Sequence, residues 1–283
     1  MTNNKKIIFL ASYPKSGNTW LRSIISSLIY NQGNFHFEDL KKIILFSQMA
    51  NFKNIDNPKF NSQGNIDFNW ISDNWIRAQK NINKQKKNVV FYKTHSVRGI
   101  VNNNFFTDES VCLAFIYVIR DPRDVIVSLS KHMGENISDS IQKVLYEKNR
   151  MTSFQKVNEL ISTWKNNIDS WMNFKTVPRL IIKYEDMVND IDSCILSIIN
   201  FLNSIANFNL KADNNLLKSV KESTSFNKLQ SLEKQFQFSE ATINTKFFRK
   251  GVVGEWRQIL SQKQAKQIEE ELRIPMKELN YLK

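Results

Sequence analysis

A short polar loop between an apolar stretch and a helical stretch constrains this chain most. The loop, residues 12–20 (Ser-Tyr-Pro-Lys-Ser-Gly-Asn-Thr-Trp), follows the apolar residues 6–11 and leads into a helical pattern over 19–30. In such a strand–loop–helix unit, the backbone N–H groups at the helix start can hold an anion. Because the loop also carries a lysine and several small hydroxyl and amide side chains, we predict that it binds a phosphate group.

This loop differs from the usual nucleotide-triphosphate loop. That motif places a lysine directly after its second glycine, whereas Lys15 precedes Gly17, the only glycine of the loop. No acidic magnesium ligand is evident at the ends of the expected strands. A nucleotide or nucleoside kinase would need both features, and it stays open as an alternative.

Four apolar runs have the pattern of strands that are buried on both faces. Each run is short, rich in Ile, Val, Phe or Tyr, and largely without polar alternation. The runs are residues 6–11, 89–93, 111–119 and 180–184. With helical patterns between them, they predict an α/β fold in which a central parallel sheet is flanked by helices on both faces.

The helical patterns and the connecting regions predict one domain over residues 1–283. Helices are expected over 19–30, 155–174 and 262–272, and Pro275 should interrupt the region after the last of them. The chain has only 7 Gly and 5 Pro and shows no linker or internal repeat. Residues 33–87 and 134–153 have weak periodicity and are expected to form helices and loops over the sheet that carry substrate contacts.

A second candidate anion site follows the third expected strand, in residues 120–124 (Arg-Asp-Pro-Arg-Asp). Asp121 suits a helix N-cap and Pro122 suits the first helical position. Arg120 would then stand at the carboxyl edge of the sheet, where open α/β folds bind ligands. Arg120 and Ser128 can hold one phosphate group together, and an ion pair between Arg120 and Asp124 is the alternative.

A third candidate anion site lies in residues 247–256 (Phe-Phe-Arg-Lys-Gly-Val-Val-Gly-Glu-Trp). Arg249 and Lys250 are adjacent cations beside Gly251, and this combination lets backbone and side chains wrap a phosphate together. Phe247 and Phe248 can stack on a base. The alternative is an ordinary basic turn.

Five segments together resemble the PAPS-dependent sulfotransferases, which have a nucleoside-kinase-like fold and use 3′-phosphoadenosine 5′-phosphosulfate (PAPS). Residues 12–20 resemble the 5′-phosphosulfate loop, and residues 117–128 resemble the 3′-phosphate segment. Residues 183–187 and 223–226 are similar to two adenine-region elements, and residues 249–251 are similar to the C-terminal Arg-Lys-Gly loop. Five motifs in the family's order are highly specific in combination.

The resemblance implies transfer of a sulfuryl group from PAPS to an acceptor hydroxyl or amine, with release of PAP (the 3′,5′-bisphosphate) and without a metal. It implies these PAPS-binding residues: Lys15, Ser16, Gly17, Asn18, Thr19, Trp20, Arg120, Ser128, Tyr184, Thr224, Phe226, Phe247, Arg249, Lys250 and Gly251. Asn18 stands where the family commonly has Thr, and we expect its amide to donate to a phosphate oxygen. The dimerisation stretch of animal members is not visible in residues 258–269, so the oligomeric state stays open.

The catalytic roles follow from the same resemblance. Residues 93–95 (Lys-Thr-His) resemble the catalytic segment, and His95 is assigned as the general base because imidazole titrates near neutral pH. Lys15 would stabilise the bridging oxygen and Lys93 would assist on the sulfuryl oxygens. Ser128 would bind the 3′-phosphate and hold Lys15 away until the acceptor arrives. A non-catalytic relative is disfavoured because the chain has both Lys15 and His95.

The net charge of +13 has several interpretations. It favours an acidic acceptor or membrane surface, and with 20 Phe and 6 Trp it also fits a nucleic-acid-binding protein. That alternative is disfavoured because the candidate residues gather at strand ends and not on one recognition helix. A solvated basic surface is the simplest interpretation. A small molecule or a glycan is expected as acceptor, with no nucleic-acid partner.

The two cysteines and the apolar segments indicate where the protein works. Cys112 and Cys194 both fall in apolar patterns and are expected to be buried. Two cysteines do not make a disulfide framework. We see no signal peptide before the first strand and no run long enough to span a bilayer, and we therefore expect a cytoplasmic protein.

Overall fold

The computed structural model describes residues 5–62, 64, 66–148, 151–154, 157–236 and 248–283. A parallel sheet with the strand order β2-β1-β5-β8 forms its centre. The strands are β1 (Ile7–Ser12), β2 (Val90–Thr94), β5 (Cys112–Ile119) and β8 (Arg179–Lys183). All four expected strands are thus confirmed within one residue at most of their ends.

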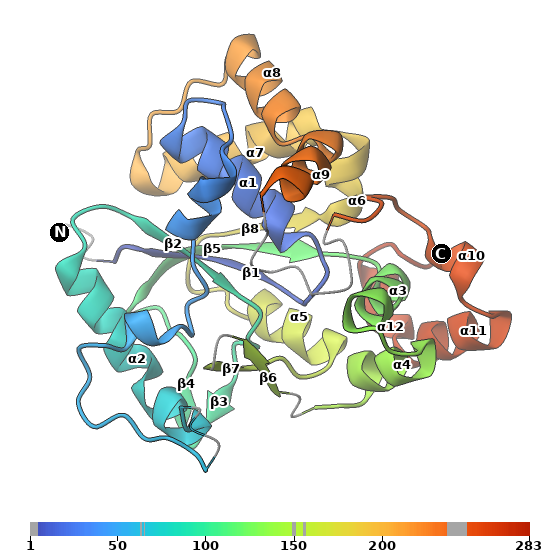
Figure 1. Cartoon of the computed structure of the whole chain (residues 1–283), viewed down its shortest axis with the longest axis horizontal. Coiled ribbons are helices and arrows are strands. Elements are labelled where there is room, and N and C mark those ends of the chain that lie inside the picture. The colour runs from blue at the N-terminus through green and yellow to red at the C-terminus, as the bar shows by residue number, and fades with distance from the viewer. Residues whose placement is uncertain (1–4, 63, 65, 149–150, 155–156, 237–247) are drawn as a thin grey trace.

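The side chains of this sheet alternate between two apolar cores. Ile8 and Leu10 of β1 pack in the core that α1 (Asn18–Tyr30) and α7 (Ile191–Ala206) cover. Ile7 and Phe9 point to the opposite core, which α2 (Phe68–Gln85) and α5 (Trp164–Met172) cover. Figure 1 shows α1 and α7 on one side of the sheet and α2 and α5 on the other. The expected α/β architecture is therefore correct, because a strand with two buried faces needs apolar residues at every position.

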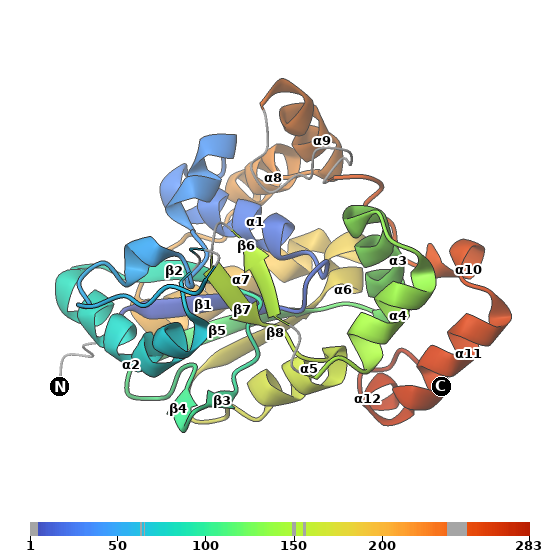
Figure 2. The same cartoon turned by 60° about the horizontal axis from the view of Figure 1, so that its bottom comes forward.

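The remaining elements extend the two layers and connect the strands and helices of the core. They are η1 (Phe37–Lys42), η2 (Met49–Asn51), β3 (Ile100–Val101), β4 (Asn104–Phe105), α3 (Pro122–Met133), α4 (Ile137–Leu145), β6 (Met151–Phe154), β7 (Val157–Leu160), α6 (Tyr184–Asn189), α8 (Asn214–Ser223), α9 (Phe226–Gln235), α10 (Trp256–Ile259), α11 (Gln262–Glu271) and α12 (Arg273–Glu278). Figures 1 and 2 place α3, α4 and the C-terminal helices beyond the carboxyl ends of the strands. In the described part of the chain, no helix combines the length and the apolar character that a membrane crossing requires.

Two expectations about helices are wrong in part. Residues 157–160 form strand β7, which pairs antiparallel with β6, and the helix begins only at Trp164. The backbone of Ser162 is left-handed (φ 62°), and the Thr163 side chain caps α5 by accepting from the Asn166 N–H. Pro275 does not interrupt a helix but lies in the first turn of α12, where its missing N–H costs no helical hydrogen bond.

The buried guanidinium of Arg123 fastens the C-terminal helices to α3. The Arg123 guanidinium, nearly inaccessible to solvent, binds the Asp121 carboxylate at 2.6 Å and also pairs with Glu269 of α11. It donates a further hydrogen bond to the Tyr281 carbonyl and lies 3.9 Å from the ring centre of Trp256. One cation at the start of α3 therefore holds three C-terminal segments.

We expect Arg123→Ala to lower the free energy of unfolding by about 3–5 kcal/mol, because the buried Asp121 carboxylate would lose its partner. Urea unfolding at neutral pH measures the change. Lys266→Ala is the matched control, since Lys266 forms an exposed pair with Glu270 on α11 that contributes at most about 0.5 kcal/mol. Equal losses in the two variants would contradict the assignment.

Candidate active site

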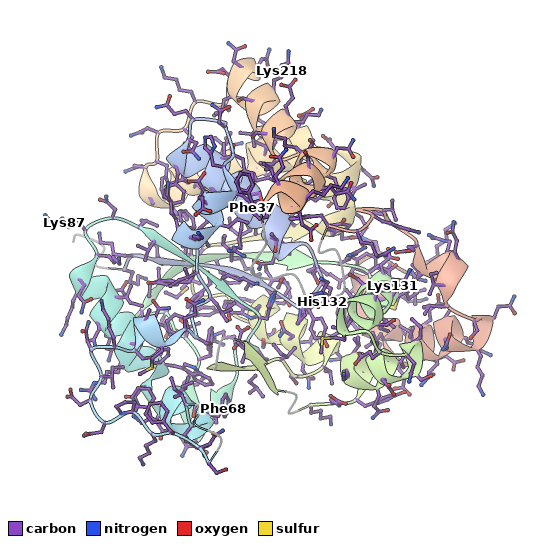
Figure 3. The ribbon with its side chains drawn as sticks, viewed as in Figure 1. Phe37, Phe68, Lys87, Lys131, His132 and Lys218 are labelled. Atoms are coloured by element: carbon purple, nitrogen blue, oxygen red, sulfur yellow. The ribbon has the colours of Figure 1, made fainter. Side chains whose placement is uncertain are left out.

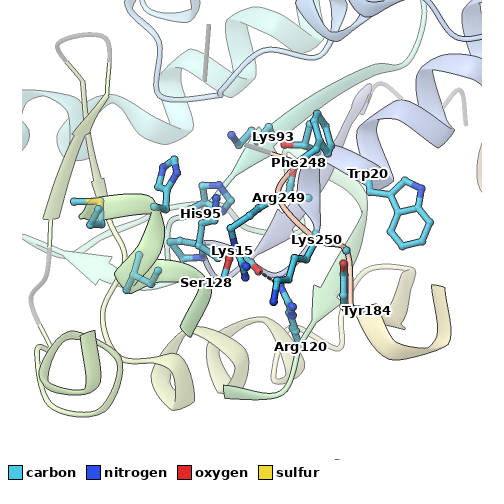
Figure 4. A pocket seen from close by; sticks show the side chains of 18 of the residues that line it. Lys15, Trp20, Lys93, His95, Arg120, Ser128, Tyr184, Phe248, Arg249 and Lys250 are labelled. Carbon is cyan, nitrogen blue, oxygen red and sulfur yellow. Dashed lines mark hydrogen bonds between the residues drawn. The ribbon is translucent and has the colours of Figure 1, made fainter. Parts of the chain in front are cut away.

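A cavity lies at the carboxyl ends of the strands and collects most of the candidate residues. Lys15, Gly17, Asn18, Thr19, Trp20, Lys93, His95, Arg120, Ser128, Tyr184, Phe226, Arg249, Lys250 and Gly251 all line it. Figure 4 shows the side chains of Lys15, Arg120, Ser128, Arg249 and Lys250 converging in its centre. The three segments that were each expected to bind an anion thus face one another.

The first loop is shaped by two residues with left-handed backbone. Lys15 has φ 66° and Gly17 has φ 101°, and Gly17 is the N-cap of α1. A Cβ on Gly17 would lie 2.6 Å from the Tyr184 ring, so only glycine fits there. Left-handed turns of this kind point successive N–H groups to one side, and the positive end of the α1 dipole adds to the attraction for an anion.

Polar atoms around this loop are suited to a ligand. Within the described residues, the Ser16 hydroxyl, the Trp20 indole N–H and the Arg120 Nε are buried and have no hydrogen-bond partner. Such groups are costly to bury when they are unsatisfied. Together with the cations of the cavity, they form a donor set that fits a molecule with several phosphate or sulfate oxygens.

Asn18 differs from the expectation. Its amide nitrogen donates to the Leu10 carbonyl at 2.9 Å and to the Ser12 hydroxyl at 3.2 Å, so both of its N–H groups point to β1. In this structure the side chain of Asn18 therefore fixes the end of β1. Asn18 also lines the cavity, and donation of its amide to a phosphate oxygen stays a prediction.

Arg120 connects the first loop to the last. Its guanidinium donates to the Lys15 carbonyl and to the Val252 carbonyl, each at 3.1 Å, and lies 4.2 Å from the centre of the Tyr184 ring. The alternative ion pair with Asp124 does not form. The Asp124 carboxylate instead accepts from the Gly254 and Trp256 N–H groups at 2.6 and 3.0 Å, which holds the last loop against α3.

Glu255 concentrates the cations of the last loop. Its buried carboxylate binds Arg249, Lys250 and Lys131, the last of these from α3. Burial opposes ionisation, but the three cations outweigh it and lower the pKa of Glu255 to about 2. Figure 3 shows Lys131 beside His132 on α3. Glu255 is therefore an anion that already neutralises part of the positive charge of Arg249 and Lys250, two of the cations that line the cavity.

His95 lies at the end of β2 with a defined ring orientation. Its Nδ1 is 2.8 Å from the Ser12 carbonyl oxygen and 3.2 Å from the Ser12 hydroxyl. Because a carbonyl only accepts, Nδ1 carries the proton and Nε2 is the basic nitrogen of the neutral ring. Lys93 lies on the same strand and lines the same cavity.

Two of the candidate residues, Ser16 and Thr224, are not among the described residues that line the cavity. Ser16 is buried, and the Thr224 hydroxyl, at the C-cap of α8, is buried and donates to the Val220 carbonyl. A contact of either residue with PAPS stays a prediction. Phe247 lies outside the described residues. Its neighbour Phe248 does line the cavity, and Gly251 lies flat against the Phe226 ring.

The structure adds residues that the sequence patterns did not single out. Pro14, Leu45, Leu129, His132, Met133, Glu159, Ile161, Val252 and Glu255 also line the cavity. Most of them lie on the β2 and α3 side, where they form an apolar wall with two polar groups, His132 and Glu159. No sequence motif marks these positions, because many side chains of similar volume can form an apolar wall.

In the described part of the chain, no three His, Cys, Asp or Glu side chains are grouped as metal ligands would be. The described site is a cationic cavity at the ends of parallel strands, closed by a strand–loop–helix unit and a basic C-terminal loop. This defines the chain as an α/β protein with a strand–loop–helix unit of the kind that binds phosphate groups and a cationic cavity at the ends of its strands.

The sequence comparisons identify the family. The sulfotransferase domain model matches residues 5–280, and the chain belongs to this family. It is 25% identical over 269 residues to the guinea-pig (Cavia porcellus) 3-beta-hydroxysteroid sulfotransferase, covering 91% of this chain and 79% of that protein. It is 22% identical over 276 residues to the flavonol 3-sulfotransferase of Flaveria bidentis, covering 93% and 79%. Sulfuryl transfer is thus the reaction class of the family.

Solved structures show the same fold. A mouse sulfotransferase complexed with PAP superposes with a TM-score of 0.62 at 21% identity, covering 97% of this chain and 86% of that one. Retinol dehydratase in complex with androsterone and PAP gives a TM-score of 0.64 at 19% identity, with 96% and 81% covered.

We expect the stability contributed by Glu255 to depend on pH. Its pKa is about 2 in the folded protein against an ordinary value of 4.5, so the contribution is complete above pH 4.5 and is lost as the pH falls toward 2. Urea unfolding of the wild type and of Glu255→Gln should therefore differ at pH 7 and converge in that window. Glu270→Gln, on the exposed side of α11, is the control. A difference that stays constant from pH 7 to pH 2.5 would refute the argument.

Proposed function

We propose that this protein transfers the sulfuryl group of PAPS to an acceptor and releases PAP, with residues 1–283 acting as one sulfotransferase domain. One observation carries the proposal: three cationic segments, far apart in the sequence, line one cavity, and Arg120 bonds to the first and the last of them. The bound PAP of the mouse sulfotransferase and of retinol dehydratase supports the same donor.

The residues of the cavity divide between the two phosphate ends and the base of the donor. The first loop, with Lys15 and the N–H groups before α1, would hold the 5′-phosphosulfate. Arg120, Ser128, Arg249 and Lys250 would hold the 3′-phosphate. The rings of Trp20, Tyr184, Phe226 and Phe248, which line the cavity, offer aromatic surfaces to the adenine.

The chemistry requires a base on one side of the sulfur and positive charge on the other. His95 Nε2 would remove the acceptor proton as the acceptor oxygen forms its bond to sulfur. Lys15 would stabilise the bridging oxygen as its bond to sulfur breaks, and Lys93 would stabilise the sulfuryl oxygens. The pinned Nδ1–H of His95 supports this role, because it leaves Nε2 as the nitrogen that can take a proton.

The acceptor would enter along the wall made by Leu45, Leu129, Met133 and Ile161. A small hydroxyl compound with an apolar body suits such a wall. The steroid and flavonol relatives are consistent with a small-molecule acceptor. We propose cytoplasmic localisation for this reaction.

Nucleic-acid binding receives less support from the structure. Figure 3 shows the exposed Lys87 and Lys218 on separate parts of the molecule, so these positive charges do not lie together on one face. Lys218, for example, forms an exposed pair with Glu222 within α8. A basic surface without one continuous face is what a solvated exterior would show.

We expect PAP to bind without metal, and ATP with Mg²⁺ to bind much more weakly, in calorimetric titrations of the purified protein. Arg249→Ala should weaken PAP binding by about 10- to 100-fold, because a hydrogen bond to a charged group contributes about 1.5–3 kcal/mol. Arg273→Ala, which removes an exposed cation of α12, is the control for net charge. Binding of ATP with Mg²⁺ but not of PAP would favour the kinase alternative.

We expect His95→Ala to lose turnover by about 10²- to 10⁴-fold while it keeps its affinity for PAP, because a general base contributes that much to proton transfer. The assay follows PAP release from PAPS with a panel of phenols and alcohols. His36→Ala, a histidine that caps η1 and does not line the cavity, should stay active. Near-normal turnover of His95→Ala would remove His95 from the mechanism.

A further inference from the structure

A buried carboxylate lies directly behind His95. Glu159 is on β7, is only 2% exposed, and contributes to the wall of the cavity. Its Oε1 accepts two hydrogen bonds from the end of β2, one from the His95 backbone N–H at 2.8 Å and one from the Thr94 hydroxyl at 3.1 Å. The Glu159 side chain on β7 therefore holds the backbone of His95, the residue that we propose as the base.

The same carboxylate stabilises the whole turn after β2. The Thr94 hydroxyl donates to Glu159 and accepts from the Ser96 N–H at 3.0 Å, so that Glu159, Thr94 and Ser96 form a continuous chain of hydrogen bonds. On the other side, the Asn167 amide donates to the His95 carbonyl at 2.9 Å. The backbone of His95 is thus bonded at its N–H and at its carbonyl.

The ring of His95 completes the arrangement. Its Nδ1 reaches the Ser12 carbonyl on β1, while its backbone N–H is held by Glu159 on β7. The Nδ1 bond needs the backbone of residue 95 in place, because the ring turns about bonds that start from that backbone. Loss of the Glu159 contact would let the turn move and would weaken the bond that selects the Nδ1–H tautomer.

We infer that Glu159 is a positioning residue for His95, which it keeps in the Nδ1–H tautomer with Nε2 directed to the reaction. The inference rests on the proposed function, since it assigns a role relative to the general base. Glu159 lies on β7, which is distant in sequence from the Lys-Thr-His segment. It acts through that segment and takes no part in the reaction itself.

The charge of Glu159 fits this role. Burial raises its pKa, while the His95 N–H, the Lys93 ammonium and the Thr94 hydroxyl favour the ionised form. A buried carboxylate is costly unless it is paired and hydrogen-bonded. An apolar side chain at position 159 would leave the His95 N–H and the Thr94 hydroxyl without this acceptor, so packing alone does not explain a glutamate there.

The test measures the His95 ring directly, in the full-length protein saturated with PAP. Long-range ¹H–¹⁵N NMR spectra distinguish the two neutral tautomers of each of the 3 histidines, and His95→Asn assigns the His95 signals. We compare the wild type, Glu159→Leu and Glu159→Gln, in which the glutamine oxygen still accepts both hydrogen bonds. Turnover and PAP affinity are measured on the same samples.

We expect the wild type and Glu159→Gln to show the Nδ1–H tautomer, and Glu159→Leu to show a mixture of both. Turnover of Glu159→Leu should fall by roughly 10- to 100-fold with PAP affinity unchanged, because small displacements of a catalytic group are costly. Glu185→Gln is the matched control, since Glu185 is a partly buried carboxylate that accepts from the Asp121 N–H and the Tyr281 hydroxyl and does not line the cavity. It should leave the His95 signals unchanged.

A pure Nδ1–H tautomer in Glu159→Leu would overturn the inference whatever the turnover. If Glu159→Leu does not fold, Glu159→Met removes the acceptor of the His95 N–H at similar side-chain length, and a pure Nδ1–H tautomer in that variant would overturn the inference in the same way. Failure of the proposed function is seen separately, as a wild type that neither binds PAP nor consumes PAPS.

Discussion

The site depends on the guanidinium of Arg120. It is bonded to backbone carbonyls of two loops that lie far apart in the sequence and is stacked on the Tyr184 ring. A guanidinium suits this position because it stays charged and its donors point in fixed directions. Since carbonyls and an aromatic face do not cancel its charge as a carboxylate would, Arg120 joins the first loop to the last and still adds to the positive field of the cavity.

The acidic residues near the cavity make this concentration of cations possible. Asp124 receives two N–H groups of the last loop, and Glu255 gathers three cations from that loop and from α3. Without such counter-charges, adjacent cations would repel one another in a partly buried site. In the proposed function, an incoming phosphate would share Arg249 and Lys250 with Glu255, and the carboxylate would weaken the attraction of these two cations for it.

The two sides of the cavity differ in the chemistry of their lining residues. The donor side is built from backbone N–H groups, cations and aromatic rings at the ends of the strands and in the last loop, and it is the side that the motifs describe. The opposite side is an apolar wall with His132 and Glu159 between its members. A polyanion requires fixed charges at fixed places, whereas an apolar wall can be made by many side chains of suitable volume.

The sequence alone determined the four buried strands, the parallel sheet and most of the polar residues that line the cavity, because uninterrupted apolar runs and loop motifs are local signals. It did not determine that residues 157–160 form a strand, since their apolar residues fit a helical stripe equally well until β6 pairs with them. Nor did it determine the partners of Asn18, Arg120 and Thr224. Tertiary structure decided that the Asn18 amide points to β1, that Arg120 bonds carbonyls, and that Glu159 stands behind His95. Hydrogen-bond partners distant in the sequence are chosen only when the strands and loops come together in space.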